Sequence, residues 1–189
     1  MNAARSGWLF STRKDSLSSK GSEIYGGLVA LARAEPFYAV HGVPDTPEGR
    51  LELIILHLVL AVRRLNRDGD PGNLKARAVM EAFVIDMDDC LREMGVGDIM
   101  VAKKVKKAAG ALYDRIRDYG AALDAKNRDA VTSLFARHLT LEETGAEASG
   151  AGVIADYALR AEAQLAMLGA SAIDTPETAF PAAPGSTGE

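Results

Sequence analysis

The sequence predicts an all-α protein, a single-domain helical bundle of about six to seven helices with disordered tails. Apolar residues recur at spacings of three and four almost throughout residues 22–168, and alternation of β-branched and polar residues never extends beyond a few positions. With 189 residues, of which 48% are hydrophobic and 25% charged, the chain is long enough for one sizeable core and too short for two ordinary domains. We therefore expect a mobile tail over residues 1–21, a helical domain over residues 22–169 and a disordered tail over residues 170–189.

Two predicted elements precede the most apolar part of the chain. A helix is expected to begin at Ser22, whose hydroxyl can accept hydrogen bonds from the free amides of a first turn, and to direct Leu28 toward the core. Pro36-Phe37-Tyr38 then predicts a short turn or helical piece. Its aromatic rings would cap one end of the core.

The next helix is expected to be the central one. Thr46-Pro47-Glu48 is a strong helix start, because threonine caps free amides and proline already has the φ angle of the first helical position. The helix is expected to run to about Arg67. Leucines at positions 53, 56 and 60 make faces outside its main stripe apolar too. A helix that is apolar on several faces is buried.

Turns rich in glycine delimit the later helices. After the cluster Asp68–Gly72, a helix is expected over about Leu74–Met94, and Gly95 suits the left-handed cap that ends it. Gly97-Asp98 then begins a long amphipathic helix that reaches about Leu123, so these two helices must be close neighbours. Further helices are predicted over about residues 128–140 and 152–168. After residue 169, small residues and prolines dominate without helical periodicity.

The apolar runs and the single cysteine indicate in which cellular compartment the protein lies. The only apolar run within residues 1–21 is Trp8-Leu9-Phe10, too short for a signal peptide, and the longest apolar stretch, Leu53–Val62, is about half as long as a bilayer crossing. The single cysteine, Cys90, is interpreted as a small buried side chain, and it cannot form a disulfide within one chain. We expect a cytoplasmic protein.

Few residues are grouped as catalysis or metal binding requires. The three histidines are dispersed, and His57, which lies among leucines, is interpreted as a core histidine. Asp86, Asp89 and Glu93 share one helix face, and paired carboxylates can do acid–base chemistry. However, the Glu-x-x-His motifs of di-iron bundles and the glycine motifs of nucleotide sites are absent. A solvated or salt-bridged acidic face is favoured over an enzyme, with no catalytic residues, no metal and no cofactor.

A cluster of four lysines is the most unusual feature of the chain. It consists of Lys103, Lys104, Lys106 and Lys107. On a helix they occupy an arc of about 160° opposite the stripe that contains Val101 and Leu112. Lysines three and four apart repel, and a cluster near a helix N-terminus opposes the helix dipole. Either the face is simply solvated, or its charge is balanced by the acidic residues around Asp86–Glu93, the acidic C-terminal quarter, anionic lipid, ribosomal RNA or a protein partner. Sequence-specific nucleic-acid recognition is not expected, because no aromatic residues interleave with the lysines.

Two groups of motifs connect the chain to a known family. The first group is Tyr25-Gly26-Gly27-Leu28-Val29-Ala30, Phe37-Tyr38, Gly42-Val43-Pro44-Asp45-Thr46, Gly49-Arg50, His57-Leu58 and Arg63-Arg64-Leu65. The second group is Asp88-Asp89, Leu91-Arg92-Glu93-Met94-Gly95-Val96-Gly97-Asp98 and Lys103-Lys104-Val105-Lys106-Lys107. Through these motifs, over roughly residues 24–140, the chain resembles the ubiquinol-cytochrome c chaperone family. Cys90 departs from the pattern, because a polar residue such as asparagine is expected there.

The resemblance implies a non-enzymatic assembly chaperone for the cytochrome bc1 complex, with residues 22–169 as the chaperone domain. Mitochondrial members bind newly made cytochrome b, work with a small partner protein and associate with the ribosome. The implied partner is therefore cytochrome b, another bc1 subunit or an early assembly intermediate. The implied location is peripheral to the inner membrane, which is the matrix side in eukaryotic relatives. The predicted partner-binding residues, from the most characteristic motif, are Arg92, Glu93, Asp98, Lys103, Lys104, Lys106 and Lys107.

An alternative function is that of a peripheral lipid-binding protein. The helix over Leu51–Val62 is unusually apolar, and the lysine cluster could contact anionic headgroups. The two functions are compatible, because an assembly factor for a membrane complex works at the bilayer surface.

Overall fold

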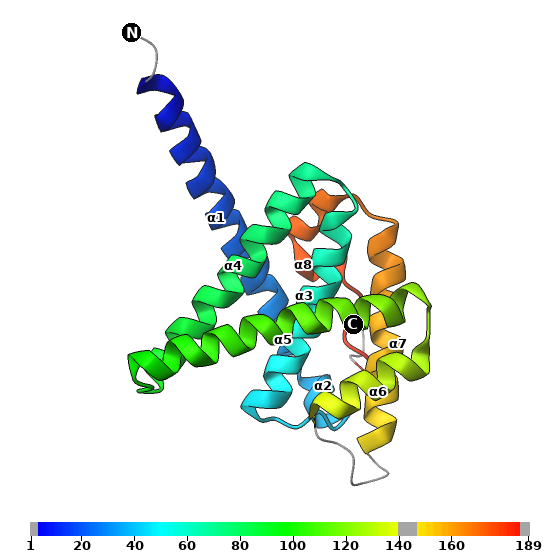
Figure 1. Cartoon of the computed structure of the whole chain (residues 1–189). Coiled ribbons are helices and arrows are strands. Elements are labelled where there is room, and N and C mark those ends of the chain that lie inside the picture. The colour runs from blue at the N-terminus through cyan, green and yellow to red at the C-terminus, as the bar shows by residue number, and fades with distance from the viewer. Residues whose placement is uncertain (1–3, 140–146, 186–189) are drawn as a thin grey trace.

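The computed structural model describes residues 4–139 and 147–185, and every regular element in this part of the chain is helical. The elements are α1 (Ala4–Ala32), α2 (Glu35–Ala39), α3 (Pro47–Asn66), α4 (Asp70–Glu93), α5 (Asp98–Asp124), α6 (Arg128–Leu139), α7 (Glu147–Ala166), the 3₁₀ helix η1 (Ala170–Asp174) and α8 (Pro176–Ala179). The turn between α4 and α5 projects to one side of the bundle, and the start of α1 extends away from it (Figure 1). The predicted all-α fold is confirmed.

α3 is the central helix, as predicted. Its N-cap is Thr46, whose hydroxyl accepts a hydrogen bond from the Gly49 amide at 3.2 Å, and Pro47 occupies the first helical position. Helices α1, α4, α5, α6, α7 and η1 all pack against it. Leu53, Leu56 and Leu60 are therefore fully buried although they point in different directions. As a result, α3 has no apolar face left for a client or a lipid, so exposed apolar surface for either must come from other elements.

α1 begins at Ala4, so the prediction of a helix start at Ser22 was wrong, and the expected tail over residues 1–21 is helical from Ala4. Ser22 is inside the helix, where its hydroxyl donates to the Ser18 carbonyl at 3.2 Å instead of capping a first turn. Gly21 does not end the helix either. It lies where α1 crosses α4, and a Cβ at this position would be 2.6 Å from the Ala78 carbonyl carbon.

The C-terminal segment is also folded, which corrects the prediction of a disordered tail from residue 170. Ile173 in η1 and Phe180 after α8 are buried in the core, and the Lys75 ammonium contacts the Asp174 carboxylate at 2.6 Å. The segment consists mostly of small residues and prolines, and only two large apolar side chains anchor it. Its sequence therefore shows no periodic apolar pattern that would predict folding. Residues 186–189 of the predicted tail and the predicted helix end at Thr140 lie outside the described residues.

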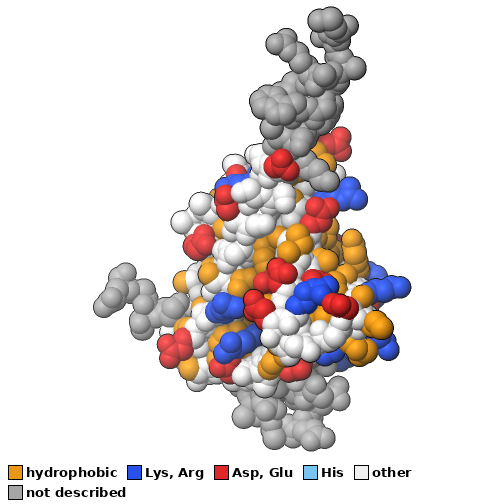
Figure 2. Space-filling view, turned by 90° about the vertical axis from the view of Figure 1, so that its left-hand side faces the viewer, with side chains coloured by type: hydrophobic (Ala, Val, Ile, Leu, Met, Phe, Trp, Pro, Cys, Tyr) orange, Lys and Arg blue, Asp and Glu red, His pale blue; other side chains and the backbone are white. Residues whose placement is uncertain are grey.

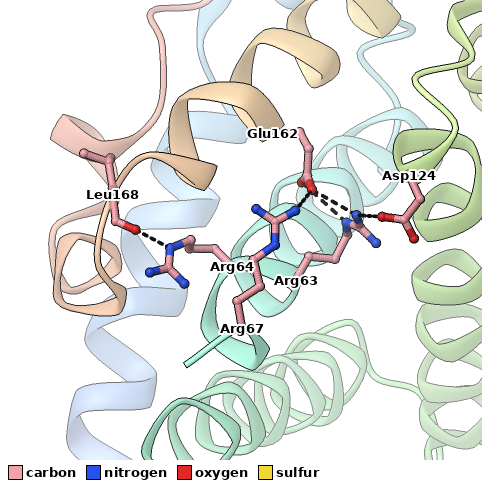
Figure 3. Close-up of polar contacts among 6 residues, drawn as sticks. All are labelled: Arg63, Arg64, Arg67, Asp124, Glu162 and Leu168. Atoms are coloured by element: carbon pink, nitrogen blue, oxygen red, sulfur yellow. Dashed lines mark hydrogen bonds and ion pairs between the residues drawn. The ribbon is translucent and has the colours of Figure 1, made fainter. Parts of the chain in front are cut away.

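Arginines near the end of α3 connect it to two other helices (Figure 3). The Arg63 guanidinium donates to Glu162 of α7 at 2.9 Å and to Asp124 of α5 at 2.6 Å. Arg67 also donates to Glu162, at 2.5 Å, and Arg64 donates to the Leu168 carbonyl at 2.5 Å. Arg63 holds the pKa of Asp124 below its usual range by a hydrogen bond and by its charge. These contacts fix the orientation of α5 and α7 on α3.

His57 lies inside the core, as the sequence predicted. Its Nδ1–H donates to the Leu53 carbonyl at 2.8 Å, and its Nε2 accepts from the Tyr157 hydroxyl at 2.8 Å. The Phe37 ring, one of the two predicted to cap the core, is fully buried and meets Tyr157 edge-on with centroids 5.2 Å apart. Burial lowers the pKa of His57 to about 4, so the ring is neutral at physiological pH.

Candidate functional site

The turn between α4 and α5 is a tight glycine-dependent structure. Gly95 has a φ of +76°, its amide donates to the Arg92 carbonyl at 2.9 Å, and the Val96 amide donates to the Leu91 carbonyl at 3.1 Å. This is the pair of hydrogen bonds that defines a Schellman cap, so the prediction for Gly95 is confirmed. After Gly97, α5 begins at Asp98. The two helices therefore meet at a fixed angle at the end of the projection.

Three of the predicted partner-binding residues lie at this turn. The Arg92 guanidinium donates to Asp98 at 2.5 Å across the turn and to Asp88 one helical turn earlier. Both carboxylates raise the pKa of Arg92. Glu93 is exposed beside them. Arg92 thus bridges the ends of α4 and α5, although exposed ion pairs of this kind contribute little to stability.

The four lysines that were predicted to bind a partner lie along the first turns of α5. All four are exposed, and none makes an ion pair with any residue described by the structure. Val101 and Leu112 on the opposite side of the helix are buried, as the helical arc predicted. The lysines thus form a continuous basic face that the bundle leaves open.

The acidic residues of α4 do not neutralise this face. Asp86 accepts a hydrogen bond from the Tyr25 hydroxyl of α1 at 2.7 Å, and Asp88 is paired with Arg92. Within the described residues, no group of three or more His, Cys, Asp and Glu side chains is arranged to hold a metal ion. The contacts of Asp86 and Asp88 make this a partly paired acidic face.

The apolar side chains exposed at the projecting turn were not predicted from the sequence. Met94 is 72% exposed, Ile99 is 88% exposed and Met100 is 47% exposed. Ile99 and Met100 fall outside the stripe of Val101 and Leu112, and that spacing was the available signal. Figure 2 views the molecule from the side to which the turn projects, where hydrophobic side chains gather between acidic and basic ones.

A shallow groove of about 690 Å³ between α4 and α5 is also lined in part by apolar side chains. Leu74, Met80, Val84 and Ile85 of α4 line it together with Tyr113 of α5. Of these, Leu74, Ile85 and Tyr113 are exposed. The hairpin formed by α4 and α5 therefore combines exposed apolar area with unpaired positive charge.

Cys90 is exposed on α4, so the prediction of a buried thiol was wrong. No side chain from Val84 to Glu93 is fully buried, because this part of α4 belongs to the projection. Partial burial and the nearby carboxylates of Asp86 and Glu93 raise the pKa of the thiol. A raised pKa keeps the thiol protonated and argues against a nucleophilic role.

Comparisons with known proteins give one family match and one structural match. The sequence model of the ubiquinol-cytochrome C chaperone family matches residues 39–179, which include the α4–α5 hairpin. The chain belongs to this family. It is similar to the crystal structure of the Cbp3 homolog from Brucella abortus, with 31% sequence identity and a TM-score of 0.79 over 94% of this chain and 97% of that one. A comparison with curated proteins gives no match.

Family membership supports the resemblance drawn from the sequence motifs. The matched range extends past residue 140, so it includes α7, η1 and α8, which the sequence motifs did not reach. Among the described residues, no helix combines the length and apolarity needed to span a bilayer.

Proposed function

We propose that the protein is a non-enzymatic assembly chaperone for the cytochrome bc1 complex, and that it binds newly made cytochrome b or an early assembly intermediate at the membrane surface. The observation that carries this proposal is the family match over residues 39–179, together with the similarity to the Cbp3 homolog. A bc1 subunit is a suitable client for a surface that combines apolar and basic side chains.

The client-binding surface in this proposal is the α4–α5 hairpin. Its polar contacts come from Arg92, Glu93, Asp98, Lys103, Lys104, Lys106 and Lys107. Exposed apolar side chains at the turn and in the groove supply area that can cover an apolar segment of the client before it is assembled. A small partner protein and the ribosome are further candidate partners, because relatives in mitochondria have both.

Affinity purification from the native membranes tests the proposal. The wild-type chain is compared with a variant in which Lys103, Lys104, Lys106 and Lys107 are changed to glutamate, and with a matched control in which they are changed to arginine. Recovery of cytochrome b by the wild type and the arginine variant, but not by the glutamate variant, supports the proposed surface. Equal recovery by all three moves the interface away from the lysines.

A deletion strain tests the function itself. The expected result is a defect in bc1 assembly and in haem insertion into cytochrome b. Normal levels of assembled complex after deletion, with normal haem insertion, would contradict the chaperone function. This outcome does not depend on which surface of the protein is used.

A second candidate function is lipid binding without a client. It is favoured by the unpaired lysines of α5, which lie beside exposed apolar side chains. Under this function the same purification recovers lipid alone. The glutamate variant then loses the lipid, and no bc1 subunit accompanies any of the variants.

A further inference from the structure

The end of the α4–α5 projection, seen in Figure 1, exposes apolar side chains beside charged ones. Met94, Ile99 and Met100 are exposed next to the glycine turn, as are Arg92, Glu93 and Asp98. At 100° per residue, Ile99 and Met100 fall within the same arc of about 160° that the four lysines occupy on α5. One face of α5 therefore begins with apolar side chains and continues with ammonium groups.

This face keeps its positive charge. Of the carboxylates near the turn, Asp88 and Asp98 are both engaged by Arg92, and Asp86 is engaged by Tyr25 of α1. Asp89 and Glu93 are exposed on α4 and make no ion pair with the lysines of α5. The outer face of α5 is thus basic even though the chain as a whole has a net charge of −4.

We propose that this turn inserts into the surface of an anionic lipid bilayer. Met94, Ile99 and Met100 enter the boundary between headgroups and acyl chains, and the four lysines contact lipid phosphates. The inference rests on the proposed function, because a chaperone for a membrane complex works where lipid is present. It adds the mode of attachment and the residues that provide it.

The shape and chemistry of the tip, formed by Met94, Ile99 and Met100, suit a bilayer as its occupant, whereas the groove between α4 and α5 stays available to the client. A protein partner usually receives an apolar projection in a matching pocket, whereas a bilayer accepts a convex apolar tip without a preformed shape. Lysine stems can lie along apolar surface while their ammonium groups reach outward, and they act as point charges without a fixed partner geometry. Mobile anionic headgroups suit such charges.

Co-sedimentation of the purified full chain with vesicles tests the electrostatic part. Vesicles of phosphatidylcholine with phosphatidylglycerol are expected to bind the chain, and those of phosphatidylcholine alone are not. Changing the four lysines to glutamate is expected to lower the partition coefficient by on the order of 100-fold or more, whereas arginine at the same positions retains it. Changing Ile99 and Met100 to serine is expected to lower it by about tenfold.

Tryptophan fluorescence tests insertion. In a Trp8→Phe background, which removes the one native tryptophan, Ile99→Trp is expected to shift to shorter wavelength on anionic vesicles and to be quenched by lipids brominated in their acyl chains. The matched control is Leu74→Trp, at the far end of α4 from the turn. Its emission is expected to stay the same when anionic vesicles are added.

Several results would overturn the inference. One is vesicle binding that does not depend on anionic lipid. A second is binding in which the emission of Ile99→Trp remains that of a tryptophan in water. A third is binding that appears only when a membrane protein is added to the vesicles. The last would make the turn a protein-docking surface. Because the assay contains only the chain and lipid, its failure leaves cytochrome b recovery in detergent unaffected, and the two proposals fail separately.

Discussion

The region around α3 and the α4–α5 hairpin differ in which side chains they bury and in whether the polar ones are paired. Around α3, the buried polar side chains Glu52, His57 and Arg64 each have hydrogen-bond partners from distant parts of the chain. At the hairpin, apolar side chains are exposed and the lysines have no ion-pair partner among the described residues. The first region is closed by its own contacts, and the second is left open for contacts with other molecules.

The largest expected effect comes from breaking a buried contact of α3. Glu52 accepts from the Tyr119 hydroxyl at 2.8 Å and pairs with Arg115 at 3.2 Å, and its side chain is almost completely buried. Glu52→Ala leaves both partners without an acceptor, so we expect the free energy of unfolding to fall by about 3–5 kcal/mol. Urea denaturation followed by circular dichroism measures it.

The matched control is Asp114→Ala. Asp114 pairs with Arg117 on the surface of α5, where both side chains are exposed. Removal of this carboxylate is expected to cost less than about 1 kcal/mol. Equal costs for Glu52→Ala and Asp114→Ala would break the contrast between the closed and open regions.

The next effect is a pH dependence that His57 gives to the core. Its pKa is lowered from 6.5 in the unfolded chain to about 4 in the folded one, so the unfolded state binds a proton first as the pH falls. The contribution of His57 to stability is complete above pH 6.5 and is lost as the pH falls toward 4. At 1.36 kcal/mol per pKa unit, the loss is about 3 kcal/mol.

Denaturation of the wild type and of His57→Phe across this pH range isolates the effect. His57→Phe lowers stability at neutral pH, because the Tyr157 hydroxyl loses its acceptor, but it is expected to flatten the slope between pH 6.5 and 4. Other titrating groups contribute equally to both proteins. Identical slopes would show that His57 does not resist protonation in the folded state.

A smaller effect is expected at the crossing of α1 and α4. Gly21→Ala places a Cβ 2.6 Å from the backbone of Ala78, so the helices must separate, and we expect a loss of about 1–3 kcal/mol. Gly26→Ala on the same helix meets nothing within 4 Å and is expected to stabilise by about 0.5–1 kcal/mol. Thermal unfolding distinguishes the two, and a stabilising Gly21→Ala would show that α1 does not pack closely on α4.

The smallest effect on stability is expected at the hairpin. Because Ile99 and Met100 are exposed, changing both to serine should alter the free energy of unfolding by no more than about 0.5 kcal/mol. The same variant is expected to lose vesicle binding. A stability loss comparable to that of Glu52→Ala would mean that these side chains belong to the core, and the proposed open surface would have to be abandoned.

Local signals in the sequence predicted the parts of the fold that depend on neighbouring residues. The Thr46-Pro47 start and the Gly95 cap require only a few adjacent groups, and both are present as expected. The packing of Gly21 against Ala78 and that of Phe180 against His57 depend on residues far along the chain. Such long-range contacts leave no periodic pattern, and both were missed.

The candidate site, like the fold, could be predicted only where it depends on local sequence. The lysine face follows from helical spacing alone, since Val101 and Leu112 fix the buried side of α5. The exposure of Cys90 and Met94 depends instead on the hairpin leaving the bundle, and helical spacing cannot show where a helix loses its neighbours.

The position of Phe180 has a consequence for synthesis of the chain. Its ring lies 5.5 Å from that of His57, and Tyr157 completes the same cluster, so the interior of α3 acquires its last partners only when residues more than a hundred positions downstream have been made. Contacts between α4 and α5, by contrast, join residues that are near in sequence. A growing chain can therefore form the hairpin before the core around α3 is complete. Apolar side chains of α3 remain uncovered, and the chain remains prone to aggregation, until the C-terminal segment has been synthesised.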